Sequence, residues 1–132
     1  MARLDGQIKR RVTEVLELVR LPQVAGRKPK ELSGGQQQRV AIARCIVYQP
    51  DLILMDEPLG ALDKKLREQM QLEIRRIHTE LGITMLYVTH DREEALGLSD
   101  VVVILSGGRI MSVGSPLQLY REPADSFTAN FL

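Results

Sequence analysis

The sequence predicts an α/β fold in which helices flank a parallel sheet, and three stretches in a fixed order carry this prediction. Residues 52–55 are consecutive apolar residues, which indicates a strand buried on both faces. A helical pattern of apolar residues follows over 64–81, and a second apolar stretch at 85–89 predicts another buried strand. A strand, a helix and a strand in this order imply a right-handed crossover between parallel strands.

Composition limits the chain to one modest globular domain. It has 132 residues, of which 44% are hydrophobic and 27% charged, and a net charge of +1. Near-neutral charge and the absence of Trp argue against nucleic acid as a partner. No apolar run has the length of a membrane span, and no signal-peptide core follows Met1, so any membrane association is expected to come through a partner.

Periodicity and turn residues predict the other elements. An amphipathic helix is expected over residues 7–21 and ends at Pro22; a loop with the basic residues Arg27, Lys28 and Lys30 follows, either as a solvated surface or as a docking or phosphate-facing patch. After residue 89 the expected elements are a helix starting at 90–96, a strand at 101–105, a glycine turn, a hairpin strand at 109–113 and a short helix at 117–121.

The first chemical motif is Leu32–Gln36, LSGGQ, which runs into a helix ending near Val47. Ser33 is a good N-cap, and Gly34 and Gly35 allow a ligand to approach the backbone closely. The free N–H groups and the positive dipole end of such a helix suit a phosphate. Cys45 on the same helix is interpreted as a small buried residue rather than a reactive thiol.

The second motif places two acids after the apolar strand, Asp56 and Glu57, before Pro58. Ligands of open parallel α/β sheets bind at the carboxyl ends of the strands. Asp56 is therefore placed to hold Mg²⁺, usually through water, and Glu57 to orient or deprotonate a nucleophilic water. His90 follows the strand at 85–89 in the same way, which favours a functional role over a structural one. His78 is interpreted as a surface residue.

These motifs, in this order, resemble the nucleotide-binding subunit of an ABC transporter. Leu32–Gln36 matches its signature motif, Leu52–Glu57 its Walker B strand with the catalytic glutamate, Gly60–Asp63 its D-loop, and His90 its switch histidine. The resemblance covers nearly the whole chain but only about the second half of that domain, which is a P-loop NTPase fold. It implies three parts: the end of the helical signature subdomain (1–48), part of the ATPase core (49–114) and a helical tail (115–132).

The resemblance also implies partners and roles. The family acts as a head-to-tail dimer, homo- or heteromeric, with ATP held between the Walker A loop of one subunit and the signature motif of the other. ATP binding across this interface is then expected of Ser33, Gly34, Gly35, Gln36 and Asp63, with Mg²⁺ on Asp56 and catalysis by Glu57 and His90. Permease subunits would hold the protein at the inner face of the cell membrane, in the cytoplasm.

The importer branch is indicated by Gly60–Asp63 and by the residues around 63–74 and 114–127, which resemble ATPases of polyamine, sugar, iron and sulfate importers. The spermidine/putrescine type looks nearest, which implies ATP-driven uptake of polyamines. The same loop, the near-neutral charge and the lack of coiled coil argue against a nucleic-acid ATPase.

One departure from the family is large: the chain contains no Gly-Lys dipeptide and thus no Walker A loop. The chain alone is therefore expected to be inactive as an ATPase. It is either part of an importer ATPase or a non-catalytic interaction module that pairs with a full-length ABC ATPase. In the family the strand at 85–89 lies beside the Walker A strand, so its edge is expected to be apolar, unpaired and prone to aggregation.

Overall fold

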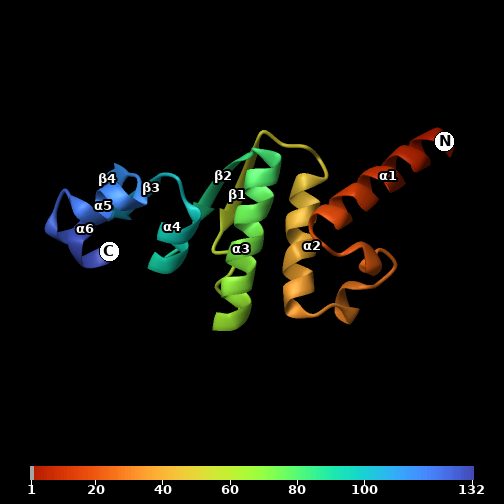
Figure 1. Cartoon of the computed structure of the whole chain (residues 1–132), viewed down its shortest axis with the longest axis horizontal. Coiled ribbons are helices and arrows are strands. Elements are labelled where there is room, and N and C mark those ends of the chain that lie inside the picture. The colour runs from red at the N-terminus through yellow and green to blue at the C-terminus, as the bar shows by residue number, and fades with distance from the viewer. Residues whose placement is uncertain (1) are drawn as a thin grey trace. The chain divides into compact units, whose positions relative to one another are not determined.

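The structure is a computed structural model that describes residues 2–132, with the side chains of residues 5–132. The chain forms two compact units, residues 1–86 and residues 87–132. Helices make up most of the first unit, and a β-hairpin with short helices makes up most of the second (Figure 1). The division predicted from family resemblance, after residues 48 and 114, stays a prediction.

The first unit contains long helices, two short 3₁₀ turns and a strand pair. In chain order its helical elements are α1 (Ala2–Leu18), η1 (Pro22–Val24), η2 (Pro29–Glu31), α2 (Gly34–Ile46) and α3 (Lys64–Leu81). Their packed faces, together with one face of the strand at 52–56, form the apolar core of this unit. Its buried members are Val15, Val19, Leu21, Val24, Ile42, Ala43, Ile46, Ile53, Met55, Leu59, Met70, Ile74 and Ile77.

Helix α1 begins and ends earlier than predicted. It stops at Leu18 rather than at Pro22 because Arg20 adopts a left-handed backbone, with φ of 57°, which a continuing helix does not allow. Only part of its predicted apolar face is buried. Val15 and Val19 are buried, whereas Ile8 and Val12 nearer the start of the helix are exposed.

Helix α3 has the bounds that the sequence predicts. The Asp63 carboxylate accepts the Leu66 N–H at 3.0 Å, and this N-cap starts the helix. Gly82 ends the helix in the left-handed region, with φ of 61°, where glycine carries no steric penalty. The predicted stripe packs inward in its central turns, where Met70 and Ile77 are fully buried.

Strands β1 (Leu52–Asp56) and β2 (Thr84–Val88) form a two-stranded parallel sheet, which confirms the predicted α/β class. The prediction that residues 52–55 are buried on both faces is wrong. Ile53 is buried, but Leu52 and Leu54 are 47% and 67% exposed, because no element among the described residues covers the second face of β1. Leu86 in β2 is likewise exposed rather than buried.

The second unit is built on a hairpin. Helix α4 (Arg92–Leu98) precedes β3 (Val102–Ser106) and β4 (Arg109–Gly114), and α5 (Pro116–Arg121) and α6 (Ser126–Phe131) follow. The strands pair antiparallel through a turn in which Gly107 and Gly108 have φ of 55° and 73°, as hairpin turns of this kind require. Helix α6 lies in the tail that the family resemblance implies to be helical, but residue periodicity did not predict it as a separate element, because Asp125 caps a segment with little helical periodicity.

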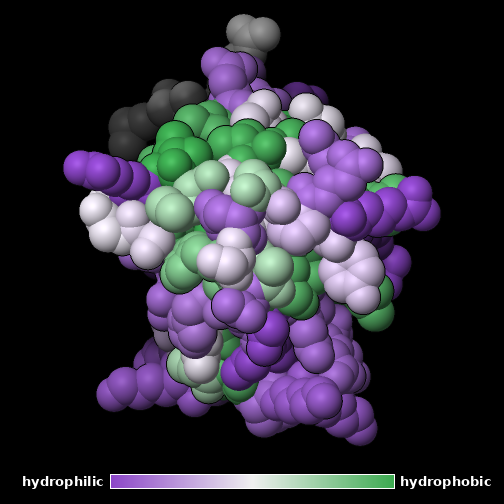
Figure 2. Space-filling view, turned by 90° about the vertical axis from the view of Figure 1, so that its left-hand side faces the viewer, coloured by the Kyte–Doolittle hydropathy of each residue, from purple (hydrophilic) through white to green (hydrophobic). Residues whose placement is uncertain are grey.

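One face of the hairpin is packed and the other is open. Val102, Ile104 and Leu119 form the buried cluster, with Phe131 and Leu132 against it. Ser112 and Thr128, both buried, are joined by a hydrogen bond of 2.8 Å between their hydroxyls. Apolar side chains also lie at the surface of the molecule (Figure 2), and those of the hairpin's open face are Val103, Leu105, Ile110 and Val113.

The expected burial of Cys45 is wrong: its side chain is exposed, since Ile42 and Ile46 occupy the inward side of α2 at this level. The basic residues Arg27, Lys28 and Lys30 are exposed. Within the described residues, no helix has the length and apolar character that crossing a membrane demands.

The buried stripe of α3 gives a stability prediction. Ile77→Ala removes a fully buried side chain and should lower the free energy of unfolding by about 2–5 kcal/mol. Leu72→Ala, on the same helix, is the matched control, because Leu72 is 74% exposed and its loss should cost within about 0.5 kcal/mol. Urea unfolding followed by circular dichroism measures both. Equal losses in the two variants would contradict the packing described for α3.

Candidate functional site

Asp56 and Glu57 stand at the carboxyl end of β1, and both are exposed. Glu57 has a left-handed backbone, with φ of 43°, which is uncommon for a residue with a side chain. Conformations of this kind cost on the order of 1–3 kcal/mol and occur most often at functional sites. The chain therefore turns sharply at the residue that the sequence singles out as the candidate base.

The loop after Glu57 is tightly hydrogen-bonded. The Gly60 N–H donates to the Glu57 carbonyl at 3.2 Å, and the Leu62 N–H donates to the Leu59 carbonyl at 3.1 Å. Leu59 is fully buried and anchors the loop in the core. The Arg67 guanidinium of α3 donates from Nη2 to the Leu62 carbonyl at 3.2 Å. These bonds fix the path from Glu57 to Asp63, the N-cap of α3.

A reciprocal capping box opens α2. The Ser33 hydroxyl accepts the Gln36 N–H at 3.4 Å, and the Gln36 side-chain oxygen accepts the Ser33 N–H at 3.0 Å. Gln37 donates its amide to the Pro29 and Leu32 carbonyls at 3.2 and 3.1 Å, which ties the preceding turn to the helix. The sequence predicts Ser33 as the N-cap, and the structure confirms it.

The two glycines of the motif have different surroundings. A Cβ at Gly34 would meet no atom within 4 Å, so the backbone there is open. A Cβ at Gly35 would lie 2.8 Å from Leu66 Cδ1, in the first turn of α3. Gly35 thus allows close packing of two helix N-termini, in addition to any approach of a ligand.

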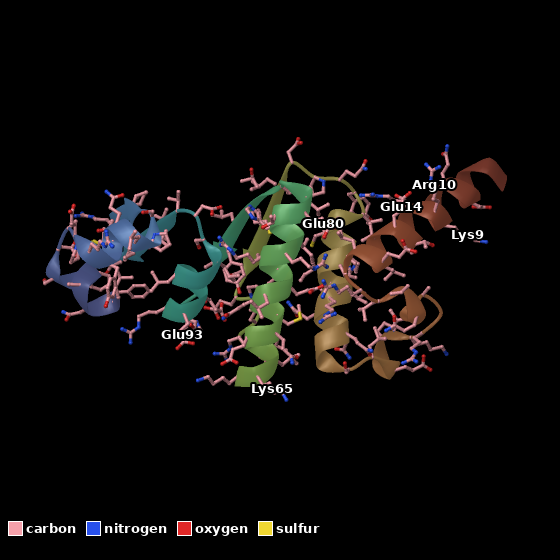
Figure 3. All side chains as sticks on the ribbon, in the orientation of Figure 1. Lys9, Arg10, Glu14, Lys65, Glu80 and Glu93 are labelled. Carbon is pink, nitrogen blue, oxygen red and sulfur yellow. The ribbon has the colours of Figure 1, made fainter. Side chains whose placement is uncertain are left out.

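This contact brings most of the predicted site residues to one end of the first unit. Because Gly35 lies against Leu66, the capped starts of α2 and α3, at Ser33 and Asp63, are neighbours. Figure 3 shows Lys65 at this end of α3 and Glu80 at the other. Strand β1 runs toward the same end of the unit in Figure 1, so its carboxyl end, at Asp56, lies at this end as well.

His90 belongs to the second unit, and its position beside the other site residues stays a prediction. It is exposed and follows β2, and Asp91 after it caps α4 by accepting the N–H groups of Glu93 and Glu94 at 2.8 and 3.1 Å. The sequence predicts a helix that starts at 90–96, and the observed helix α4 begins at Arg92, two residues after His90.

Sequence reasoning missed one residue near His90, the buried Glu94. Its Oε2 accepts hydrogen bonds from the Tyr87 hydroxyl at 2.9 Å and the Thr89 hydroxyl at 2.7 Å. A glutamate in a charged run such as 91–94 resembles a solvated helix start. The sequence did contain one signal. Tyr87 and Thr89 are two residues apart at the end of an apolar strand, so their hydroxyl-bearing side chains are expected on the same face of that strand.

The residues present fit a magnesium nucleotide. No group of three or more His, Cys, Asp or Glu side chains in the described part of the chain could hold a metal by itself. Mg²⁺ is commonly held by one or two carboxylates together with substrate phosphates, and Asp56 meets that requirement. The open backbone at Gly34, in the first turn of α2, meets the requirement of a phosphate for N–H donors.

The fold and the motifs resemble those of an ABC ATPase domain, and comparisons with known proteins support this resemblance. The sequence profile described as ABC transporter matches residues 3–60. An ATP-binding cassette of an ABC transporter, solved in its ADP conformation, has a TM-score of 0.80 at 25% identity and covers 94% of this chain and 50% of its own. CbiO1 from Clostridium perfringens, part of an ABC transporter complex, has a TM-score of 0.82 at 30% identity, over 89% of this chain and 47% of its own.

The curated relatives are ATP-binding proteins of polyamine import. The spermidine/putrescine import ATP-binding protein PotA of Mesorhizobium japonicum is 52% identical over 127 residues, which is 96% of this chain and 35% of the relative. PotA of Thermobifida fusca is 56% identical over 127 residues, 96% of this chain and 33% of the relative. The chain thus spans about a third of the length of the curated relatives it matches.

The left-handed backbone at Glu57 gives a prediction with an internal control. Glu57→Ala and Glu57→Gly remove the same carboxylate, but only glycine adopts a φ of 43° without steric cost. The glycine variant should therefore be more stable than the alanine variant by about 1 kcal/mol, measured by urea unfolding. At an ordinary position alanine is the more stable of the two. If the alanine variant were the more stable of the two at residue 57, the strained backbone described here would be contradicted.

Proposed function

We propose that this chain forms part of the ATP-binding subunit of an ABC importer, which uses ATP hydrolysis to drive polyamine uptake across the membrane. The observation that carries the proposal is the pairing of the Ser33–Gln36 capping box with the Asp63 cap at the adjacent starts of α2 and α3. The names of the relatives, which are spermidine/putrescine import proteins, support the polyamine class.

The chemistry follows from charge and position. The capping box takes up the N–H groups of Ser33 and Gln36. The N–H groups of Gly34 and Gly35 and the positive dipole end of α2 are therefore what this turn offers to the γ-phosphate of an ATP that a second subunit holds. Asp56 would hold Mg²⁺, which would supply positive charge to neutralise the phosphates. Glu57 orients the attacking water and takes its proton, and His90 donates a hydrogen bond to the γ-phosphate.

The arrangement implies two kinds of partner. A second ABC ATPase subunit, the same or a different one, supplies the Walker A loop in a head-to-tail dimer, with Asp63 at the interface. Permease subunits hold the dimer at the inner face of the cell membrane, in the cytoplasm. CbiO1, a solved relative, is part of such a multi-subunit transporter complex, which supports this assignment.

The test places this sequence in a full-length protein. The 127-residue stretch of Thermobifida fusca PotA that matches this chain is replaced by the matching residues of the chain, which gives a protein termed the hybrid subunit. The hybrid subunit should hydrolyse ATP, and Glu57→Gln should lower kcat by about 100-fold or more, because general-base catalysis contributes about 10²–10⁴-fold. Glu68→Gln is the matched control, since Glu68 is exposed on α3 and should leave kcat unchanged.

The same hybrid subunit separates the outcomes. An unchanged kcat in Glu57→Gln would overturn the catalytic assignment. A folded hybrid subunit without ATPase activity, whose signature motif still supports hydrolysis by an added full-length PotA, would favour the non-catalytic pairing module. ATP hydrolysis without spermidine uptake in vesicles that carry the Thermobifida fusca permease would leave the ATPase role in place and remove the polyamine role.

A further inference from the structure

The carboxylate of Glu94 is buried beside the candidate histidine, within the second unit. Glu94 is 3% exposed, and its Oε2 accepts hydrogen bonds from both the Tyr87 and the Thr89 hydroxyls. Burying a carboxylate is costly unless hydrogen bonds compensate for the lost hydration. A single oxygen with two hydroxyl donors, at 2.9 and 2.7 Å, provides such compensation. The arrangement indicates that this carboxylate holds the end of β2.

The Thr89 hydroxyl has a second role, because it also accepts the N–H of Asp91 at 3.0 Å. It therefore links the two residues on either side of His90. The Asp91 carboxylate in turn accepts the N–H of Glu94 at 3.1 Å. Three hydrogen bonds thus close a ring through Thr89, Asp91 and Glu94, and His90 lies on the chain segment that this ring encloses.

Helix capping alone does not explain this pattern. In a capping box, the acid at the third helical position accepts the backbone N–H of the N-cap residue. Glu94 occupies that position relative to the N-cap Asp91, yet the Asp91 N–H donates to Thr89. Glu94 instead accepts bonds from the strand that leads to His90. The carboxylate thus joins the helix after His90 to the strand before it.

We propose that Thr89 and Glu94 are positioning residues, which fix the backbone of His90 so that its imidazole meets the γ-phosphate in a defined orientation. This inference rests on the proposed role of His90 in ATP hydrolysis. Neither residue contacts the nucleotide in this proposal. Their contribution is geometric, and displacements of about 1 Å in a catalytic group can reduce a rate by about 100-fold.

The experiment compares two hydroxyl deletions in the hybrid subunit. Thr89→Val keeps the side-chain shape but opens the ring, and it should lower kcat by about 10- to 100-fold with little change in the KM for ATP. Tyr87→Phe removes the other donor to the same Glu94 oxygen but leaves the ring closed, and its kcat should stay within about threefold of the parent. Thr89→Ser restores the hydroxyl and should restore kcat.

Coupling to His90 distinguishes positioning from simple destabilisation. If Thr89 acts through the imidazole, Thr89→Val should cause no further loss of kcat in a His90→Ala background. The same fractional loss in both backgrounds would overturn the proposal. Equal losses from Thr89→Val and Tyr87→Phe would also overturn it, because the ring would then have no special role.

Two further results complete the test. Should the Thr89→Val subunit not fold, Glu94→Met provides the measurement, since its flexible, unbranched side chain has a similar length and removes the acceptor of both hydroxyls. A folded Glu94→Met subunit with the parent kcat would overturn the proposal. A parent-like kcat in His90→Ala would remove the proposed role of His90, and this inference with it. A low kcat in His90→Ala with normal activity in Thr89→Val would overturn this inference alone.

Discussion

The first unit depends on the burial of helix α3. Met70 and Ile77 on this helix are fully buried, and the Asp63 cap determines where it begins. Because the loop after Glu57 leads directly into that cap, the position of α3 also determines the position of the loop that carries the candidate site residues. The contact between Leu66 and Gly35 then fixes where α2 begins relative to α3. A single apolar stripe thus brings the starts of α2 and α3, with their capping residues Ser33 and Asp63, together.

An ion pair between the buried Glu73 and the partly exposed Arg76 lies beside this packing. Glu73 is 5% exposed, and its carboxylate accepts a bond from the Arg76 guanidinium at 2.8 Å. That hydrogen bond is the main reason why the pKa of Arg76 is raised. Arg76 also donates to the Leu18 carbonyl at the end of α1. The Glu73–Arg76 pair thus connects α3 to the carbonyl at the end of α1.

The sequence predicts those features whose cause is local. The bounds of α3, the Ser33 cap and the hairpin turn at Gly107 and Gly108 follow from side chains that bond or bend their own backbone, so no distant partner is needed. The start and end of α1 were less well predicted, because the end depends on the left-handed backbone of a non-glycine residue, Arg20.

Burial depends on what covers a face, and there prediction from sequence was weaker. Leu52 and Leu54 have the apolar character of a fully buried strand, yet one face of β1 is open among the described residues. Cys45 and Glu94 deviate in opposite directions, since the small residue is exposed and the charged one is buried. Their positions are decided by neighbours on other elements, which periodicity does not identify.

Glu57, the candidate catalytic residue, departs from local rules of backbone conformation. Three described residues other than glycine have a positive φ, namely Arg20, Gln49 and Glu57. Arg20 and Gln49 each follow a helix, where a left-handed residue commonly ends the helical hydrogen bonding. Glu57 follows a strand, so helix termination does not explain its backbone. Its conformation turns the chain from the end of β1 into the loop that leads to Asp63. This strained conformation persists because the surrounding structure holds the loop in place: Leu59 is buried in the core, and Asp63 caps the start of α3.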